Sequence, residues 1–174
     1  VIAAGWRETD DQRLHRLMRG QHHLPPFSDP QLAGLRLELH TAMLAPDHPF
    51  NWSMEQVWPL ATPAGAPFAG ASVLPLPQTL LHSAVHFAWQ HSMTFGAWRT
   101  FRGVALMLRE PGWQWTPFVE LAQRTRARTA CYWTLRLTER LCGVGVPREI
   151  LNALAPPNAA WVMRALDRHF IAQL

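Results

Sequence analysis

The chain has 174 residues, 48% of them hydrophobic and 16% charged, with 16 basic residues against 12 acidic ones. This composition excludes a disordered protein, and two cysteines, Cys131 and Cys142, are too few for a disulfide scaffold. We find no apolar run of membrane-spanning length and no signal-peptide pattern. We therefore expect a soluble, cytoplasmic protein with no membrane partner.

The basic residues are all arginine, and acidic residues are interspersed among them. The absence of lysine excludes mechanisms that need a lysine Schiff base or a phosphate-loop lysine. The interspersed acids argue against a dense basic patch, so we expect no specific nucleic-acid partner.

The first part of the chain predicts a short helix followed by short strands. Gly5 to Gly20 has the apolar spacing of a helix, and Gln21 to Phe27 holds a short strand that stops at its proline pair. The clearest strand is Gly34 to Leu39, where leucines alternate with polar residues. Residues 45–75 are rich in proline, glycine and alanine, and predict loops, a helical turn over Ser53 to Trp58 and one or two short strands.

After Pro75 the apolar spacing is helical, and we expect Thr116 to cap one of the helices. The helices are expected at Gln78 to Ser92, Ala97 to Arg109, Thr116 to Thr125, Arg128 to Cys142, Pro147 to Leu154 and Asn158 to Leu174. The chain is therefore predicted to be α+β and predominantly α-helical. Residues 1–75 form the edge of a small mixed β-sheet, and residues 76–174 form a C-terminal helical bundle domain.

Glu38 and His40 are the first candidates for a functional site. On a strand their side chains point the same way, about 6.5–7 Å apart along the chain, with Leu37 and Leu39 buried opposite. A carboxylate beside an imidazole suits metal binding or proton transfer. Spacing alone favours the alternative, an exposed polar strand face balanced by Arg36.

His82 and His86 are the second candidates. Residues at i and i+4 share one helix face, while His91 leaves that face. The pair can bind a metal or form a polar seam that faces a cleft, but no glutamate lies between the histidines and no third ligand has a characteristic spacing. The other face, which we expect to pack in the core, carries Leu81, Val85 and Ala88.

A group of arginines extends from the end of the third predicted helix into the fourth. Such a group can hold phosphates, or it can form a solvated helix face that is partly paired with Glu120 and Glu139. The arginines are Arg124, Arg126, Arg128, Arg136 and Arg140.

Several segments together follow the order of a known family. Leu35 to His40 resembles the "v-E-L-H" strand of the bacterial nucleotidyltransferase-family proteins, a branch of the polymerase-beta-like nucleotidyltransferase superfamily. Val73 to His82 resembles their "v-L-x-P-x-x-x-L-L-h" segment, and His86 matches the next histidine of that helix. The later segments in family order are Trp98 to Leu108, Trp113 to Trp115, Ala122 to Arg128 and Leu141 to Pro147.

The resemblance implies a function and a set of site residues. In that superfamily a Gly-Ser turn and an Asp-x-Asp strand precede a third carboxylate, and the three acids hold two divalent metals, here Mg²⁺. Glu38 takes the place of the third carboxylate, as a catalytic residue and metal ligand. Arg36, His40, His82 and His86 become candidates for the substrate pocket. The intact protein would transfer a nucleoside monophosphate from a nucleoside triphosphate to an unidentified acceptor.

The chain also departs from the family pattern. No Gly-Ser turn with Asp-x-Asp precedes Glu38, Asp10 and Asp11 lie in a helical context, and Gly103 stands where the family usually has an aspartate. We therefore expect the C-terminal part of a longer enzyme, or a degenerate member, that by itself binds no Mg²⁺ and is inactive. The alternatives are a non-catalytic helical protein-interaction module and a metal-dependent helical protein that uses His82 and His86.

Overall fold

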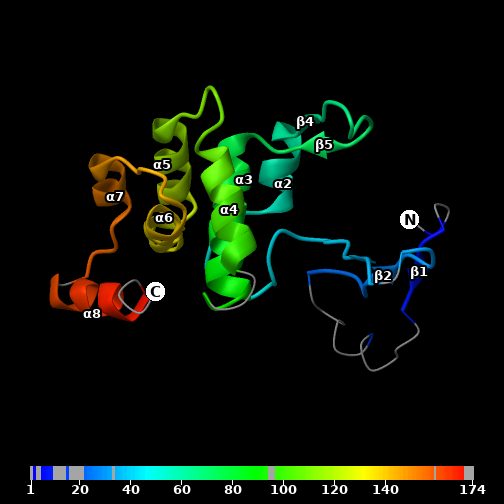
Figure 1. Ribbon diagram of the computed structural model, residues 1–174, viewed down its shortest axis with the longest axis horizontal. Helices are drawn as coiled ribbons and strands as arrows, with labels where there is room; N and C mark the ends of the chain where they lie inside the picture. The colour runs from blue at the N-terminus through cyan, green and yellow to red at the C-terminus, as the bar shows by residue number, and fades with distance from the viewer. Residues whose placement is uncertain are drawn as a thin grey trace. The chain divides into compact units, whose positions relative to one another are not determined.

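A computed structural model describes residues 2, 5–9, 15, 22–32, 34–93, 97–158 and 160–170. It confirms an α+β protein that is mainly helical (Figure 1). The chain divides into two compact units, which we name the front unit (Val1–His48) and the helical unit (Pro49–Leu174). Residues 49–75 thus group with the helices, and the domain boundary expected near Pro75 stays a prediction.

The front unit contains a small antiparallel sheet, in the order β1-β2-β3 among the described residues. Its strands are β1 (Arg7–Glu8), β2 (Phe27–Ser28) and β3 (Arg36–Leu37). The predicted helix over Gly5 to Gly20 is wrong at its start, because β1 pairs with β2 and this pairing overrides the local helical pattern. Most of that predicted helix lies outside the described residues. The strand predicted over Gln21 to Phe27 begins at Phe27 instead, after the two prolines, which have no N–H to donate.

The strand predicted over Gly34 to Leu39 forms only in part. Of the predicted stretch only β3 pairs with β2. Pairing resumes at His40, which forms an isolated antiparallel bridge with His23. The Leu24 N–H donates to the Leu39 carbonyl over 2.8 Å and holds the two segments together here. Glu38 therefore lies just outside the ladder, between two paired positions.

The helical unit begins with a single helical turn and two short strands, as the sequence predicts, and the two strands pair with each other. The Ser53 N–H donates to Gln56 Oε1 over 3.0 Å, a side-chain contact that closes the start of the first helix. The elements are α2 (Met54–Val57), the 3₁₀ turn η2 (Trp58–Leu60), and the antiparallel pair β4 (Thr62–Pro63) and β5 (Ser72–Val73).

Over the described residues the predicted helices after residue 75 all form, with shifts at their ends, and the predicted end at Leu174 lies outside the described residues. Gln114, not Thr116, occupies the N-cap of α5, so the prediction for Thr116 is wrong. Gly143 ends α6 with a φ of 64°, a left-handed conformation that glycine adopts without steric cost. The elements are α3 (Leu76–Val85), the π-helix η3 (His86–Gln90), α4 (Ala97–Met107), α5 (Trp115–Arg124), α6 (Arg128–Cys142), α7 (Arg148–Leu154) and α8 (Ala160–Phe170).

The core of the helical unit lies around α6, which contacts α3, α4, α5 and α7 (Figure 1). Phe87 packs edge-on against Phe101, with ring centroids 5.1 Å apart, and both contact Leu137 in one buried cluster. Leu81 and Val85 are fully buried, as predicted, whereas Ala88 is only half-buried. None of the helices in the described part of the chain has the length and apolar surface needed to span a bilayer.

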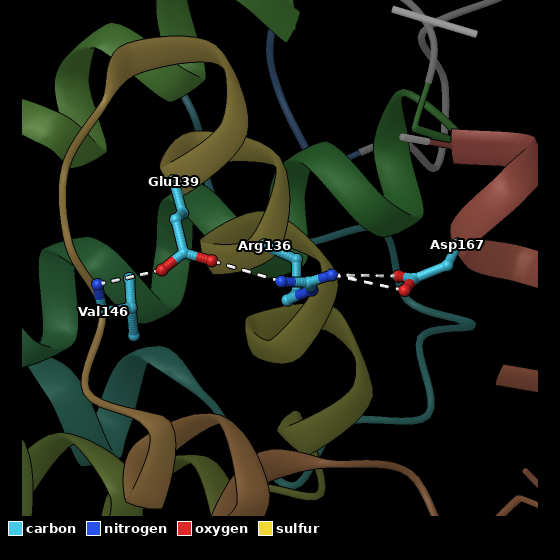
Figure 2. A network of polar contacts seen from close by, with 4 residues as sticks. All are labelled: Arg136, Glu139, Val146 and Asp167. Atoms are coloured by element: carbon cyan, nitrogen blue, oxygen red, sulfur yellow. Dashed lines mark hydrogen bonds and ion pairs between the residues drawn. The ribbon is translucent and has the colours of Figure 1, made fainter. Parts of the chain in front are cut away.

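A network of polar contacts joins α6 to the segments that follow it (Figure 2). Arg136 lies 3.2 Å from Glu139 and 3.2 Å from Asp167 of α8, while the Val146 N–H donates to the other Glu139 oxygen over 3.3 Å. Partial burial lowers the pKa of Arg136, but the charge and hydrogen bond of Asp167, together with the charges of Tyr132 and Glu139, outweigh it, so the net pKa is raised. No residue from 160 to 169 is buried, and this ion pair is one of the described contacts that join α8 to α6.

Candidate functional site

Glu38 lies on the exposed side of the front unit. Both Glu38 and His40 are exposed, and so is Arg36 on β3. Leu37 and Leu39 are half-buried rather than buried, because strands this short cover little apolar surface. The structure thus gives Glu38 the solvent access that a substrate-binding carboxylate needs. Its catalytic role stays a prediction.

Three histidines that come from two paired segments, His22, His23 and His40, form what we call the front histidine cluster. The ring centroid of His22 lies 4.8 Å from that of His23 and 4.9 Å from that of His40. Partial burial lowers the pKa of His40, the nearby His23 lowers it further, and Glu38 partly opposes this. Sequence reasoning identified His40 but missed its two neighbours. They were missed because the antiparallel bridge between His23 and His40, which brings these rings together, cannot be read from local spacing.

The surroundings of Glu38 do not fit a two-metal magnesium centre. Mg²⁺ prefers oxygen ligands, whereas the residues two positions away on either side carry an imidazole and a guanidinium. The nearby acid Asp29 already accepts the N–H groups of Gln31 and Leu32. Over the residues that the structure describes, no group of three or more His, Cys, Asp or Glu side chains has the geometry to hold a metal.

His82, His86 and His91 form a continuous row in the helical unit. Ring centroids are 5.5 Å apart for His82 and His86, and 4.7 Å apart for His86 and His91. The expectation that His91 leaves this face is wrong because the chain forms a π-helix over η3. The His91 N–H donates to the His86 carbonyl over 3.3 Å, and this i to i+5 turn restores His91 to the row.

A cavity of about 230 Å³ lies in the helical unit, bounded by α2, α3 and α5. Its mouth is formed by the exposed residues Asn51, Gln56, Leu60 and Arg124. Its floor is formed by the buried residues Trp52, Val57, Leu121 and Thr125, together with the half-buried Gln78. The chain therefore holds a polar-mouthed hollow with a largely apolar floor.

The histidine row touches this cavity indirectly. The His82 ring lies against Trp52, with centroids 5.9 Å apart, and Trp52 lines the cavity floor. Sequence reasoning proposed His82 for a pocket and Arg124 for anion binding, and missed the residues around them. Asn51 and Gln78 lie in separate segments without a shared motif, so only the folded chain reveals their proximity.

The remaining predicted site residues divide between the two units. Arg36, Glu38 and His40 belong to the front unit, whereas His82 and His86 belong to the helical unit. The expectation that the two histidines border a groove facing Glu38 concerns both units and stays a prediction.

Comparison with known families identifies the class of protein. The chain belongs to the family described as uncharacterised nucleotidyltransferase, whose model matches residues 2–143. The match includes the front unit with Glu38 and extends through α6. No curated protein and no solved structure matches the chain.

Proposed function

We propose that the intact protein transfers a nucleoside monophosphate from a nucleoside triphosphate to a small acceptor. The family match over residues 2–143 is the observation that carries this proposal. In this reaction an acceptor oxygen forms a bond to the α-phosphorus, the bond to the β-phosphate oxygen breaks, and pyrophosphate leaves. The acceptor, the nucleotide and membership of the polymerase-beta-like superfamily are parts of the proposal that rest on resemblance.

Within this proposal Glu38 supplies one carboxylate of the reaction centre. Its exposure beside Arg36 supports the assignment, because a guanidinium can hold triphosphate oxygens next to the carboxylate. The other acids and the Mg²⁺ ions that the resemblance implies would come from outside this chain. We accordingly propose that this chain alone is inactive. We also propose that the protein is located in the cytoplasm.

The test uses the chain within its full reading frame and measures pyrophosphate release from each nucleoside triphosphate. Glu38→Gln should lower the rate at least about 10²-fold, because the amide removes the negative charge with which this position would help to hold Mg²⁺. Glu55→Gln is the matched control, since Glu55 is an exposed acid of the helical unit. A rate that is unchanged in Glu38→Gln overturns the assignment of Glu38.

A second candidate function is a non-catalytic interaction module. The exposed rings of Trp58, Phe68 and Trp161, each at least 65% accessible, are the side chains that such a module could use for contact. The same assay separates the two candidates, because an interaction module releases no pyrophosphate in any form of the protein.

A further inference from the structure

The cavity between α2, α3 and α5 has a polarity pattern that points to a ligand. We propose that it binds a small anion that carries at least one hydroxyl group, either a hydroxylated carboxylate or a phosphate monoester. The binding site stands on its own geometry. That its ligand is the acceptor of nucleotidyl transfer rests on the proposed function.

The floor of the cavity offers acceptors, so the buried end of the ligand must donate. Gln78 Oε1 is buried and receives no hydrogen bond from the described residues. The Thr125 hydroxyl already donates its proton to the Leu121 carbonyl over 2.8 Å, which leaves only its lone pairs for a ligand. A ligand hydroxyl can donate to either oxygen. The burial of a polar oxygen without a partner is costly, and binding would remove that cost.

The mouth of the cavity offers donors, so the outer end of the ligand must accept. Gln56 Oε1 is taken by the Ser53 N–H, which leaves the amide NH₂ of Gln56 to donate. Arg124 adds a guanidinium, and no carboxylate among the described residues forms an ion pair with it. A guanidinium beside an amide donor suits a carboxylate or phosphate, which accepts two parallel hydrogen bonds.

The size of the cavity sets an upper bound on the ligand. Its volume of about 230 Å³ lies below the roughly 300 Å³ at which pockets for drug-sized ligands begin. A nucleoside triphosphate is therefore too large to be enclosed. The apolar floor around Trp52 and Val57 suits the short carbon skeleton of a small hydroxylated anion.

The test is calorimetric titration of the full chain with D-glycerate, with glycerol 3-phosphate and with uncharged glycerol. At least one of the two anions should bind at least tenfold more tightly than glycerol. The affinities of D-glycerate and glycerol 3-phosphate then show whether the mouth of the cavity prefers a carboxylate or a phosphate. Arg124→Gln should weaken anion binding at least tenfold, and Gln78→Leu should weaken it without a loss of helicity in circular dichroism. Arg126→Gln is the matched control, because Arg126 is an exposed arginine two residues along that does not line the cavity.

Two results overturn this site: neither anion binds more tightly than about 10 mM, or Arg126→Gln weakens binding as much as Arg124→Gln. The site and the proposed function fail separately. Anion binding in a protein that releases no pyrophosphate in its full reading frame upholds the site and overturns the transferase. Transfer without anion binding at this cavity overturns the site alone.

Discussion

The front unit and the helical unit are stabilised in different ways. In the front unit each described strand has two residues, and the buried residues among those described are His22, Pro26, Phe27 and Leu44. In the helical unit α6 alone runs for 15 residues and buries seven side chains. Long periodic elements bury a continuous core, whereas short paired segments leave most of their side chains in water.

This difference has a functional consequence. The exposed segment around Glu38 can present charged groups to a large, charged substrate. The packed helices instead enclose a small cavity whose walls are fixed by buried residues such as Trp52 and Leu121. The nucleotide chemistry proposed for the front unit and the small-molecule binding proposed for the helical unit both depend on this contrast.

The largest expected effect is loss of the aromatic cluster in the helical unit. Phe87→Ala should lower the free energy of unfolding by about 3–5 kcal/mol, because it leaves a cavity beside Phe101 and Leu137. Urea unfolding followed at 222 nm measures this change. Phe68→Ala is the control, since Phe68 is 69% exposed and should cost less than about 0.5 kcal/mol. Equal effects would show that this cluster is not the core.

Phe27→Ala makes the same substitution in the front unit, where we expect a smaller decrease in the free energy of unfolding. Phe27 is buried, yet it lies in a two-residue strand that pairs with β1 and β3. Its loss should expose the backbone of β3 and speed amide hydrogen exchange over Arg36–Leu37. Exchange that is unchanged there would mean that the sheet does not depend on Phe27.

The ion pair between α6 and α8 should contribute less again. Arg136→Met should cost no more than about 1 kcal/mol, because the charged groups of the pair are 28% and 41% accessible and water screens them. Hydrogen exchange should accelerate in α8 and stay unchanged in the middle of α6. Arg140→Met is the control, as an exposed arginine of the same helix. Acceleration in both variants would contradict a specific role for Arg136.

The smallest expected effect is the dependence of the stability of the front unit on pH. His40 has a pKa below its ordinary value of 6.5 in the folded protein, so the unfolded chain binds more protons between the two values. Stability of the front unit should therefore rise with pH through this window and be lost as the pH falls below about 6.5. His40→Gln should flatten the dependence of the unfolding midpoint on pH. A nuclear magnetic resonance titration that places the His40 midpoint above 6.5 would contradict this.

The sequence predicted the helical unit well because its apolar spacing is long and its helix ends are marked. The spacing predicted Arg128 to Cys142 with both ends correct, and Gly143 marks the end of that helix. The front unit was predicted poorly because its strands depend on pairing between distant segments. Arg7 and Glu8 form a strand only because Phe27 and Ser28 lie opposite, and no local pattern contains that information.

The candidate sites show the same division. Spacing in a regular helix paired His82 with His86, and the structure confirms their contact. His91 was misplaced because no local pattern indicates the π-helix, which shifts the face by one residue. The cavity could not be predicted at all, because Asn51, Gln78 and Arg124 meet only through tertiary packing.

The most direct test of this account is calorimetric titration of the 174-residue chain with ATP and Mg²⁺. Two-metal nucleotidyl transfer needs several converging carboxylates, and Glu38 is the one acid that the resemblance places at such a centre. We predict weak binding or none, and no dependence on Mg²⁺. Tight, Mg²⁺-dependent binding that disappears in Glu38→Ala would contradict the account, because it would show that this chain already contains a complete nucleotide site.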